Sequence, residues 1–415
     1  MIAIASSILY CIFPIFSTPE RKNFTQGVRN LKTVGIICEY NPLHLGHRKQ
    51  IKRIREEFGT DCGIVCAMSG NYVQRGMPAI LDKSLRAKAA VLSGADLVLE
   101  LPVTTSLSSA EGFAAGGVVI LSPVCDTLCF GAEEPDPTML MQLAQALLSK
   151  QFPDFLKQAL ETGCSFPAAR QTALSQMGID SSMLSQPNNI LAVEYCKAIL
   201  SQNANLDIFP ILRSGSYHAE IADSENPSAT AVRNLMLNAY NWRTSVPRGA
   251  REVFQDAPLH NIAAGERAIL SKLRTMKDHE FESLPFGSEG LWRKLMHESR
   301  RQNTLEDILT AVKSKRYTRT RLDRMVMCAF LGITADMLDS PVPYTRVLAF
   351  TDRGREILKA VKAQGTYLNA GEQAEHPYWE LEKRCGDLYG LFCIDGVEPP
   401  QSEQNRRVFY HRTNP

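Results

Sequence analysis

The sequence predicts an α/β protein with a parallel, doubly wound sheet, followed by a mainly α-helical C-terminal region. Between residues 33 and 212, short apolar runs alternate with segments of helical periodicity, as in sheets whose strands are joined by right-handed helical crossovers. Polar, glycine-containing clusters follow several of these runs, and strand signals fade beyond Asn241. In such sheets the functional site lies beyond the carboxyl ends of the strands.

The first predicted strand covers residues 33–38 and leads through a turn into a helix. Its sequence, TVGIIC, is apolar and partly β-branched, as in a buried parallel strand. Asn41-Pro42 predicts a turn. Apolar side chains then recur at helical spacing through residues 46–58, so these residues are predicted to form a helix.

The remaining elements continue the alternation. Further strands are predicted at residues 61–68, 95–101, 127–130 and 206–212. Helices are predicted at residues 83–92, 114–121 and 188–200, and another begins at Ser228. Residues 138–176 are predicted to be a helical insertion. Residues 250–335 are predicted to be mostly helical, and the tail from Leu338 returns to mixed structure with an apolar run at 347–350. We therefore expect one region at 33–245 that carries the sheet and a mainly helical region at 246–415.

Residues 1–32 are expected to be an extension that is disordered or arises from an upstream start. The run from Ile2 to Phe16 is almost wholly apolar. It is too short to span a bilayer comfortably and lacks the basic residues that open a signal peptide. A membrane anchor is the alternative.

The composition is ordinary for a globular protein of two or three domains, with 415 residues, 44% apolar and 22% charged. A formal net charge of +2 predicts no strong overall attraction to nucleic acid, so any such binding must use local patches. The eleven cysteines include no CxxC pair. This usage favours reduced thiols and a cytoplasmic protein. A membrane or DNA partner is not expected.

His44, Gly46 and His47 lie where the first strand passes into the first helix. Unpaired backbone N–H groups and the positive end of the helix dipole favour a phosphate there, and Gly46 lets it approach the main chain. The two imidazoles can hydrogen-bond phosphate oxygens as negative charge builds on an α-phosphorus. HxGH in this position predicts a nucleotide site. The alternative is that the histidines only cap and line a loop.

Other polar groups are predicted at the same edge. Arg75 lies in the polar segment 69–76 after the second strand, and Lys83 and Arg86 follow it. These cations could neutralise a triphosphate or leaving pyrophosphate, or they could be ordinary surface charges.

Ser228, Thr230 and Arg233 open a helix after the strand at 206–212. Their hydroxyls and guanidinium would supply donors where phosphate charge develops. The alternative is an ordinary N-cap.

These motifs belong to a longer series of short segments along the chain: EYNPLHLGH, MSGNYVQRG, GADLVLELP, FGAEE, PNNILAVEY, RSGSYH, SATAVR, RYTRTRLDR and PYTRVLAF. As an ordered series it resembles the tRNA(Met) cytidine acetate ligase family, which belongs to the HxGH nucleotidyltransferase superfamily. The resemblance implies a Rossmann-like ATP-binding catalytic domain at 33–245 and a tRNA-binding region at 246–415. It also implies an ATP-dependent ligase that forms acetyl-adenylate and passes the acetyl group to N4 of the wobble cytidine of elongator tRNA(Met).

Carried over by position, the resemblance makes His44 and His47 catalytic. ATP contacts are implied for Val34, Gly35, Ile36, Ile37, Cys38, Glu39, Tyr40, Asn41, Pro42, Leu43, His44, Leu45, Gly46, His47, Gly131, Asn188 and Arg213, with Asn189 as the alternative to Asn188. Phosphate contacts are expected for Lys83, Ser228, Thr230 and Arg233. Mg²⁺ is expected with the ATP, and no protein metal site.

The tRNA must present an unstacked cytidine, because N4 is otherwise out of reach. A basic cluster in the helical region is the candidate for RNA contacts: Lys313, Lys315, Arg316, Arg319, Arg321 and Arg324. The alternative is a solvated helix face.

Two rival functions stay open at this point. One is an adenylyltransferase that acts on a small molecule without RNA. The other is a non-catalytic RNA-binding protein of the same fold. Acetate is also not distinguished from other small acids, because one methylene changes binding by only about 1–3 kcal/mol.

Overall fold

The computed structural model describes residues 31–213, 227–341, 344–361, 367–400 and 403–413. The expected extension at 1–32 falls almost wholly outside these ranges, as does the RSGSYH segment after Arg213.

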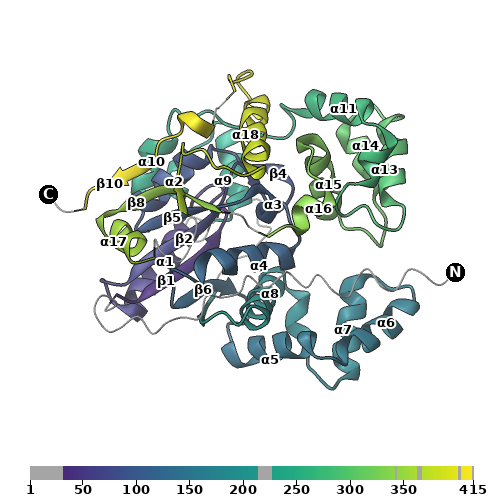
Figure 1. The fold of residues 1–415 in the computed structure, drawn as a ribbon, viewed down its shortest axis with the longest axis horizontal. Helices are drawn as coiled ribbons and strands as arrows, with labels where there is room; N and C mark the ends of the chain where they lie inside the picture. The colour runs from purple at the N-terminus through teal and green to yellow at the C-terminus, as the bar shows by residue number, and fades with distance from the viewer. Residues whose placement is uncertain (1–30, 214–226, 342–343, 362–366, 401–402, 414–415) are drawn as a thin grey trace.

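Among the described residues, eight strands form one sheet in the order β10-β8-β5-β2-β1-β6-β7, with β9 beside β8 (Figure 1). Its parallel part consists of β1 (Thr33–Cys38), β2 (Gly63–Ser69), β5 (Leu97–Leu101), β6 (Thr127–Ala132) and β7 (Asp207–Leu212). These are the five strands predicted from the sequence, with ends that differ by one or two residues, so the α/β class and the doubly wound topology are confirmed.

The sheet does not end at residue 245. Its further strands are β8 (Thr345–Thr351), β9 (Tyr367–Asn369) and β10 (Phe409–His411). β8 pairs antiparallel with β5, and β9 and β10 pair parallel with β8. In the apolar run at 347–350, the first three residues are buried in this position and Phe350 is half-buried. The C-terminal region is mainly helical, as expected, and it also supplies these three strands, which complete the sheet.

Helices cover both faces of the sheet (Figure 1). Side chains of one face of β1 pack with α1 (Leu45–Phe58), α2 (Lys83–Leu92), α9 (Ala229–Leu237) and α10 (Arg248–Phe254). The other face packs with α4 (Ala110–Leu121), α5 (Pro137–Leu148), α8 (Pro187–Ser201) and α17 (Asp352–Val361). Gly117 of α4 and Gly35 of β1 permit close packing, because a Cβ at either position would press on Ile37 or Leu121.

A third core joins the C-terminal helices to a hairpin. The helices are α11 (Glu266–Thr275), α12 (Asp278–Glu282), α13 (Leu291–Ser299), α14 (Leu305–Val312), α15 (Arg319–Leu331), α16 (Ala335–Asp339) and α18 (Tyr378–Tyr389). The polar segment 69–76 contributes to a short hairpin of β3 (Tyr72–Val73) and β4 (Met77–Pro78). Tyr72 of this hairpin and Leu107 after α3 (Val103–Ser106) pack in the same core as α15.

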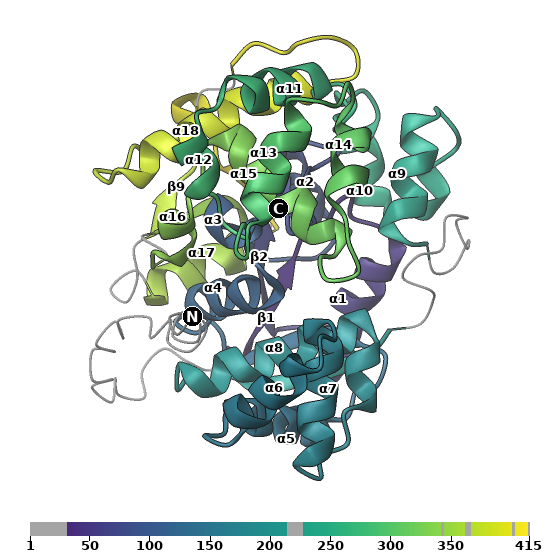
Figure 2. The same cartoon turned by 90° about the vertical axis from the view of Figure 1, so that its right-hand side faces the viewer.

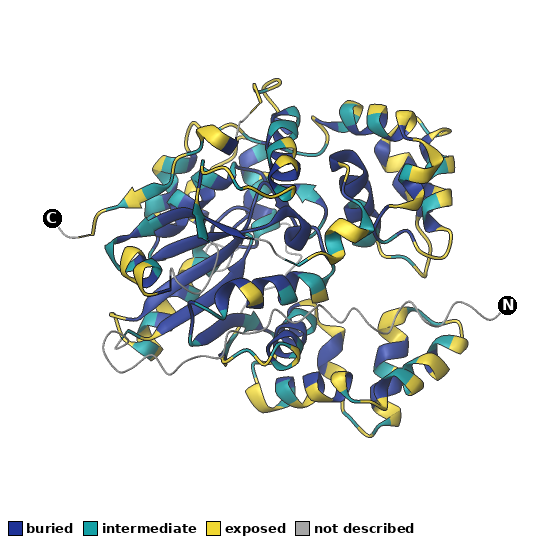
Figure 3. Cartoon of the chain, in the orientation of Figure 1, coloured by how far each residue is buried: buried dark blue, intermediate teal, exposed yellow. Residues whose placement is uncertain are grey.

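The helical insertion at 138–176 is confirmed as α5 together with α6 (Phe152–Glu161) and α7 (Phe166–Gln176). In Figure 1, α6 and α7 lie at the lower right of the sheet, and α11, α13, α14 and α15 lie at the upper right. The inner strands β1, β2 and β5 are buried, whereas both helix groups carry exposed residues on their outer faces (Figure 3). No described helix is both long and apolar enough to cross a membrane. The ten described cysteines are unpaired.

Candidate active site

The two histidines lie at the first turn of α1, directly after the central strand β1. His44 is the N-cap residue: its Nδ1 accepts from the backbone N–H of Gly46 at 3.1 Å. His47 closes the turn from the other side, because its Nδ1 accepts from the backbone N–H of His44 at 3.2 Å. The two rings lie 3.8 Å apart between centroids. The histidines thus cap the helix and are also held as a fixed pair.

This capping fixes the tautomer of each imidazole. Because both Nδ1 atoms accept hydrogen bonds, the N–H of a neutral ring must be on Nε2 in His44 and in His47. His44 Nε2 is buried and has no hydrogen-bond partner among the described residues. A buried donor without a partner is costly in a protein interior. A phosphate oxygen would satisfy it.

The surroundings keep both rings neutral. Burial, followed by the nearby Arg213 and Arg233 guanidinium groups, lowers the pKa of His44 to about 3. The pKa of His47 is also well below its ordinary value, through burial, His44 and Arg213. At neutral pH the pair therefore presents two neutral Nε2–H donors beside two arginines, an environment suited to an anion.

Gly46 is required by the ring of His44. A Cβ on Gly46 would lie 2.9 Å from His44 Cε1 and 3.0 Å from Nδ1. Tyr40, whose backbone has a positive φ of 44°, packs its ring 4.8 Å from that of His47. The loop is thus shaped to hold the imidazoles in one arrangement.

A second segment of the site joins the end of β6 to the start of α8. The Glu133 carboxylate accepts from the side-chain amide of Asn188 at 2.5 Å and from the backbone N–H of Asn189 at 2.8 Å. Arg213, which follows β7, donates to Asn188 Oδ1 at 2.8 Å. Asn189 is fully buried, and its Oδ1 accepts from the backbone N–H groups of Glu133 and Glu134. Asn188 therefore faces the arginine, whereas Asn189 shapes the loop.

A third segment comes from α9. Ser228 caps the helix by accepting from Ala231 N at 3.0 Å. Arg233 donates to Thr230 Oγ1 at 3.0 Å and to the Asn41 carbonyl at 2.7 Å. Together with its effect on His44, this contact places Arg233 beside the histidine loop. The predicted N-cap is thus confirmed, and Arg233 and Arg213 both act on the imidazole of His44.

Lys83 and Arg86 have other roles than the phosphate contacts expected of them. Lys83 is buried and pairs with Glu100 at 2.6 Å and with Glu403 at 2.9 Å. Arg86 is fully buried and donates to backbone carbonyls that include those of Glu39 and Ser69. Both cations are committed to internal partners, so the expectation that they meet phosphate is corrected. The sequence placed them after a strand end but could not show that they point inward.

Most of the strand residues predicted to contact ATP are core residues. The side chains of Val34, Ile36 and Cys38 pack beneath α1, and Ile37 packs beneath α4. Leu43 is also fully buried. Their side chains support the loop rather than line the site, and contact with a nucleotide is left to the backbone and to the residues that follow β1.

The remaining predicted positions lie at the carboxyl edge. Gly131 pairs with Ile211, and a Cβ there would reach only ordinary contact with Arg213. Glu39 accepts from the backbone N–H of Gln74 in the β3–β4 hairpin at 3.0 Å. Arg75 is half-buried at the tip of that hairpin. The hairpin is thus tied to the end of β1, as expected for segment 69–76.

The basic cluster at 313–324 is largely neutralised by its own neighbours. Arg319 pairs with Glu306 and Asp323, and Arg316 with Glu289. Arg321 donates to the Phe286 carbonyl. Arg324 is buried and its guanidinium lies 4.9 Å from the ring of Phe286. Arg324 is therefore structural, which corrects its expected role in RNA contact, while Lys313, Lys315 and Arg316 stay exposed.

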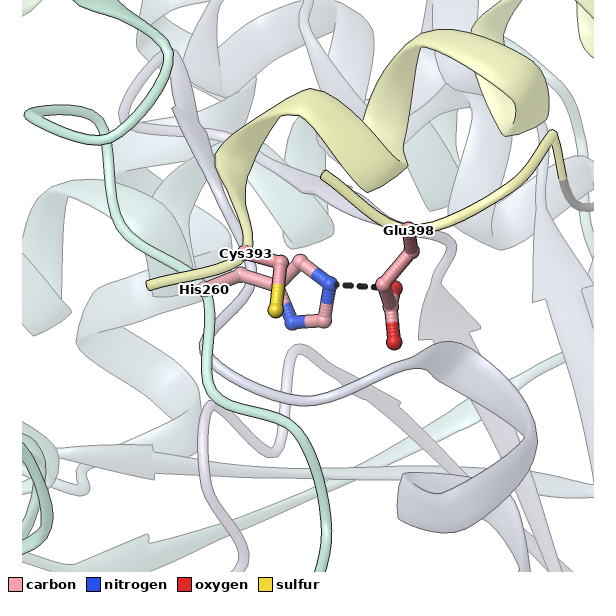
Figure 4. Close-up of side chains that lie close together, drawn as sticks. All are labelled: His260, Cys393 and Glu398. Atoms are coloured by element: carbon pink, nitrogen blue, oxygen red, sulfur yellow. Dashed lines mark hydrogen bonds and ion pairs between the residues drawn. The ribbon is translucent and has the colours of Figure 1, made fainter. Parts of the chain in front are cut away.

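A separate group of metal-ligand types lies at His260, Cys393 and Glu398, with ligand atoms within 4.8 Å of one another (Figure 4). His260 Nε2 bonds to Glu398 at 2.9 Å, and its ring stacks on Tyr389 at 4.1 Å. The hydrogen bond engages Nε2 of the histidine, whereas its Nδ1 is buried with no hydrogen-bond partner among the described residues. We interpret the group as a tie between the loop before α11 and the turn after α18.

Comparison with known proteins agrees with this geometry. A family model described as HIGH Nucleotidyl Transferase matches residues 31–405. The tRNA(Met) cytidine acetate ligase of Clostridium novyi (strain NT) is 37% identical over 356 residues, which cover 81% of this chain and 88% of that protein. The ligase of Clostridium kluyveri (strain NBRC 12016) is 36% identical over 389 residues, or 87% and 92% of the two chains. The chain belongs to the tRNA(Met) cytidine acetate ligase family.

Solved structures extend this likeness to the whole fold. Crystal structures of Thermotoga maritima TmcAL, one apo and one bound with alpha-thio ATP, have TM-scores of 0.85 and 0.82. Each is 29% identical and covers 92% of this chain and 100% of that chain. The predicted family and the nucleotidyltransferase fold are confirmed.

Proposed function

We propose that this protein is an ATP-dependent ligase that joins acetate to N4 of the wobble cytidine of elongator tRNA(Met). The observation that carries the proposal is the pair of neutral, fixed imidazoles at the start of α1, with Arg213 and Arg233 beside them. The membership of the family and the ATP analogue in the Thermotoga maritima structure support it.

In the first step an acetate oxygen attacks the α-phosphorus of ATP in line, and the bond to the β-phosphate oxygen breaks. Pyrophosphate leaves and acetyl-adenylate forms. The Nε2–H groups of His44 and His47 donate to α-phosphate oxygens as their charge grows, and Arg213 and Arg233 attract the phosphates. Because the donors are held by helix capping before ATP arrives, little reorganisation is needed in the transition state.

In the second step the cytidine N4 attacks the acetyl carbonyl, AMP leaves with the bonding electron pair, and N4 loses a proton. No side chain becomes acetylated. The step requires that the base leave its stack and reach the carboxyl edge of the sheet.

Mg²⁺ would enter with ATP and be held by phosphate oxygens and water. Among the described site residues, the Glu133 oxygens already accept from Asn188 and Asn189, and the other polar groups that face the histidines are cations and amides. This donor set suits the nucleotide better than a protein-held divalent ion. The ion would neutralise charge on the leaving pyrophosphate.

The test is incubation of purified protein with ATP, labelled acetate and unmodified elongator tRNA(Met), followed by nucleoside analysis. We expect N4-acetylcytidine that depends on all three substrates. Acetate-dependent exchange of pyrophosphate into ATP without tRNA separates the first step from the second. Exchange with no labelled tRNA would favour the small-molecule rival, and the loss of both activities would favour a non-catalytic RNA-binding protein.

A further inference from the structure

The segment from α9 to α10 is unusual in its charge. Residues 228–251 contain four arginines, at 233, 243, 248 and 251, and no aspartate or glutamate. Within the part of the chain that the structure describes, no carboxylate lies within ion-pair distance of Arg243, Arg248 or Arg251. The basic cluster at 313–324 differs, because Arg316 and Arg319 are paired with carboxylates there. A polyanion such as RNA would therefore bind residues 228–251 more favourably than the cluster at 313–324, because Arg243, Arg248 and Arg251 do not have to give up a carboxylate partner among the described residues.

Aromatic side chains accompany these arginines. Tyr240 is 66% exposed, and among the large hydrophobic side chains of the described residues only Val397 and Leu212 are more exposed. Its backbone N–H bonds to the Leu235 carbonyl at 2.8 Å, so the residue is held at the end of α9. Trp242 is half-buried, and the guanidinium of Arg243 lies 5.9 Å from its ring. Exposed rings beside arginines are the groups on which unpaired RNA bases stack.

This surface continues from the active site. Arg233 of α9 bonds to the Asn41 carbonyl in the histidine loop. From Arg233, α9 extends to Leu237, about 6 Å at 1.5 Å per residue, and Tyr240 follows just beyond the end of the helix. Figure 2 shows α9 on the same side of the molecule as α1.

We propose that Tyr240, Trp242, Arg243 and Arg248, here called the α9 surface, bind the unpaired nucleotides of the anticodon loop that flank the reacting cytidine. The proposal rests on the proposed function, since it needs an RNA substrate. Tyr240 stacks on a base, and the arginines contact the phosphates of the same strand. The surface thus holds the loop while one base enters the site at His44.

The test uses the full-length protein and measures the Kd of an unmodified elongator tRNA(Met) transcript at several salt concentrations. Tyr240→Ala is expected to weaken binding about 5- to 150-fold, the range for loss of one base stack, while Tyr240→Phe keeps wild-type binding. The double variant Arg243→Gln/Arg248→Gln is expected to lower the salt slope by about 1.4, or 0.7 for each phosphate contact with a single strand.

The matched control is Arg293→Gln. Arg293 of α13 is exposed, and its guanidinium lies 4.9 Å from the ring of Trp292, so it repeats the chemistry of Arg243 in the helical group. It is expected to leave the Kd unchanged. Acetate-dependent pyrophosphate exchange without tRNA should be normal in every variant.

Wild-type Kd and salt slope in Tyr240→Ala and in the double variant would overturn the α9 surface, as would an equal loss in Arg293→Gln. If wild-type protein acetylates tRNA in that case, the proposed function stands and only the surface is wrong. A wild-type protein that neither binds nor acetylates the tRNA would overturn both.

Discussion

His44 and His47 each have two tasks, and the two nitrogens of each ring divide them. Nδ1 accepts a backbone N–H at the helix start, so Nε2 is left to donate. The sequence offered two interpretations of these histidines, as helix caps or as catalytic groups. The structure shows that the two are compatible. Capping is the means by which the donors are oriented.

The first prediction concerns these donors. His47→Ala and His44→Ala should each reduce the turnover by about 2–4 kcal/mol of transition-state stabilisation, with ATP affinity little changed, because the hydrogen bonds strengthen as charge develops. His44→Gln, whose amide N–H can replace Nε2–H, should retain more activity than His44→Ala. The measurements are steady-state pyrophosphate exchange and ATP titration. Near-normal turnover in both folded alanine variants would refute the catalytic assignment.

A second residue-scale prediction follows from the lowered pKa of His44. The unfolded chain binds a proton at His44 below pH 6.5, whereas the folded protein does not until the pH nears 3. Folded stability is therefore complete above pH 6.5 and decreases as the pH falls below it, by about 1.4 kcal/mol at pH 5.5 for this one group.

Urea unfolding at pH 7.5 and pH 5.5 would measure this effect. His44→Gln should remove about 1.4 kcal/mol from the difference between the two pH values, since glutamine does not titrate. His279→Gln, at an exposed histidine of α12, is the control and should leave the difference as it is in the wild type. Equal pH dependence of wild type and His44→Gln would mean that the ring is not buried as described.

At the scale of elements, the β3–β4 hairpin connects the end of the sheet to the helical group. Gln74 bonds to Glu39 at the end of β1. Gly76, with a φ of 77°, lies against the backbone of Asp323 and Arg324 in α15, where a Cβ would overlap main-chain atoms. The hairpin is thereby held between β1 and α15, and the position of the helices relative to the site depends on this contact.

The element-scale prediction is that Gly76→Ala destabilises the protein well beyond the cost of its backbone conformation. Gly178 has a similar φ of 73° but nothing within 4 Å of an added Cβ, so Gly178→Ala isolates that conformational cost, about 1 kcal/mol. Gly76→Ala should lose a further 1–3 kcal/mol or so through overpacking. Equal stability of the two variants in urea would show that α15 does not lie against the hairpin.

At the scale of the whole molecule, buried ion pairs attach the C-terminal segment around Glu403 and Arg406 to α2 and β8. Glu403, which is 1% exposed, accepts from Lys83 of α2 at 2.9 Å, from Arg346 of β8 at 2.6 Å and from Arg406 at 3.0 Å. Arg406 also pairs with Asp82, the N-cap of α2, at 2.9 Å. Residues more than 300 positions apart are thus fixed to one another in a nearly water-free site.

We predict that Glu403→Gln destabilises the protein by about 3–5 kcal/mol, because it leaves buried cations without their shared carboxylate. Glu380→Gln is the control, since Glu380 forms an exposed pair with Lys383 and should change stability by less than about 1 kcal/mol. Thermal and urea unfolding of the two variants provide the comparison. If Glu403→Gln were as stable as Glu380→Gln, the ionic cluster could not be what holds the C-terminal segment.

The sequence by itself determined the parallel strands, the helix start at the histidines and the family. These depend on local signals: apolar runs of strand length, the spacing within HxGH, and the N-cap at Ser228. Each is set by residues that are neighbours in the chain, so their pattern is visible without a fold.

Only the tertiary structure decided which charged side chains face the site. Lys83 and Arg324 looked like surface cations, yet one pairs with Glu403 and the other lies against Phe286. The structure also decided that β8 and β10 complete the sheet. The physical reason is that burial and ion pairing depend on partners that lie from tens to hundreds of residues away, whose positions no local periodicity encodes.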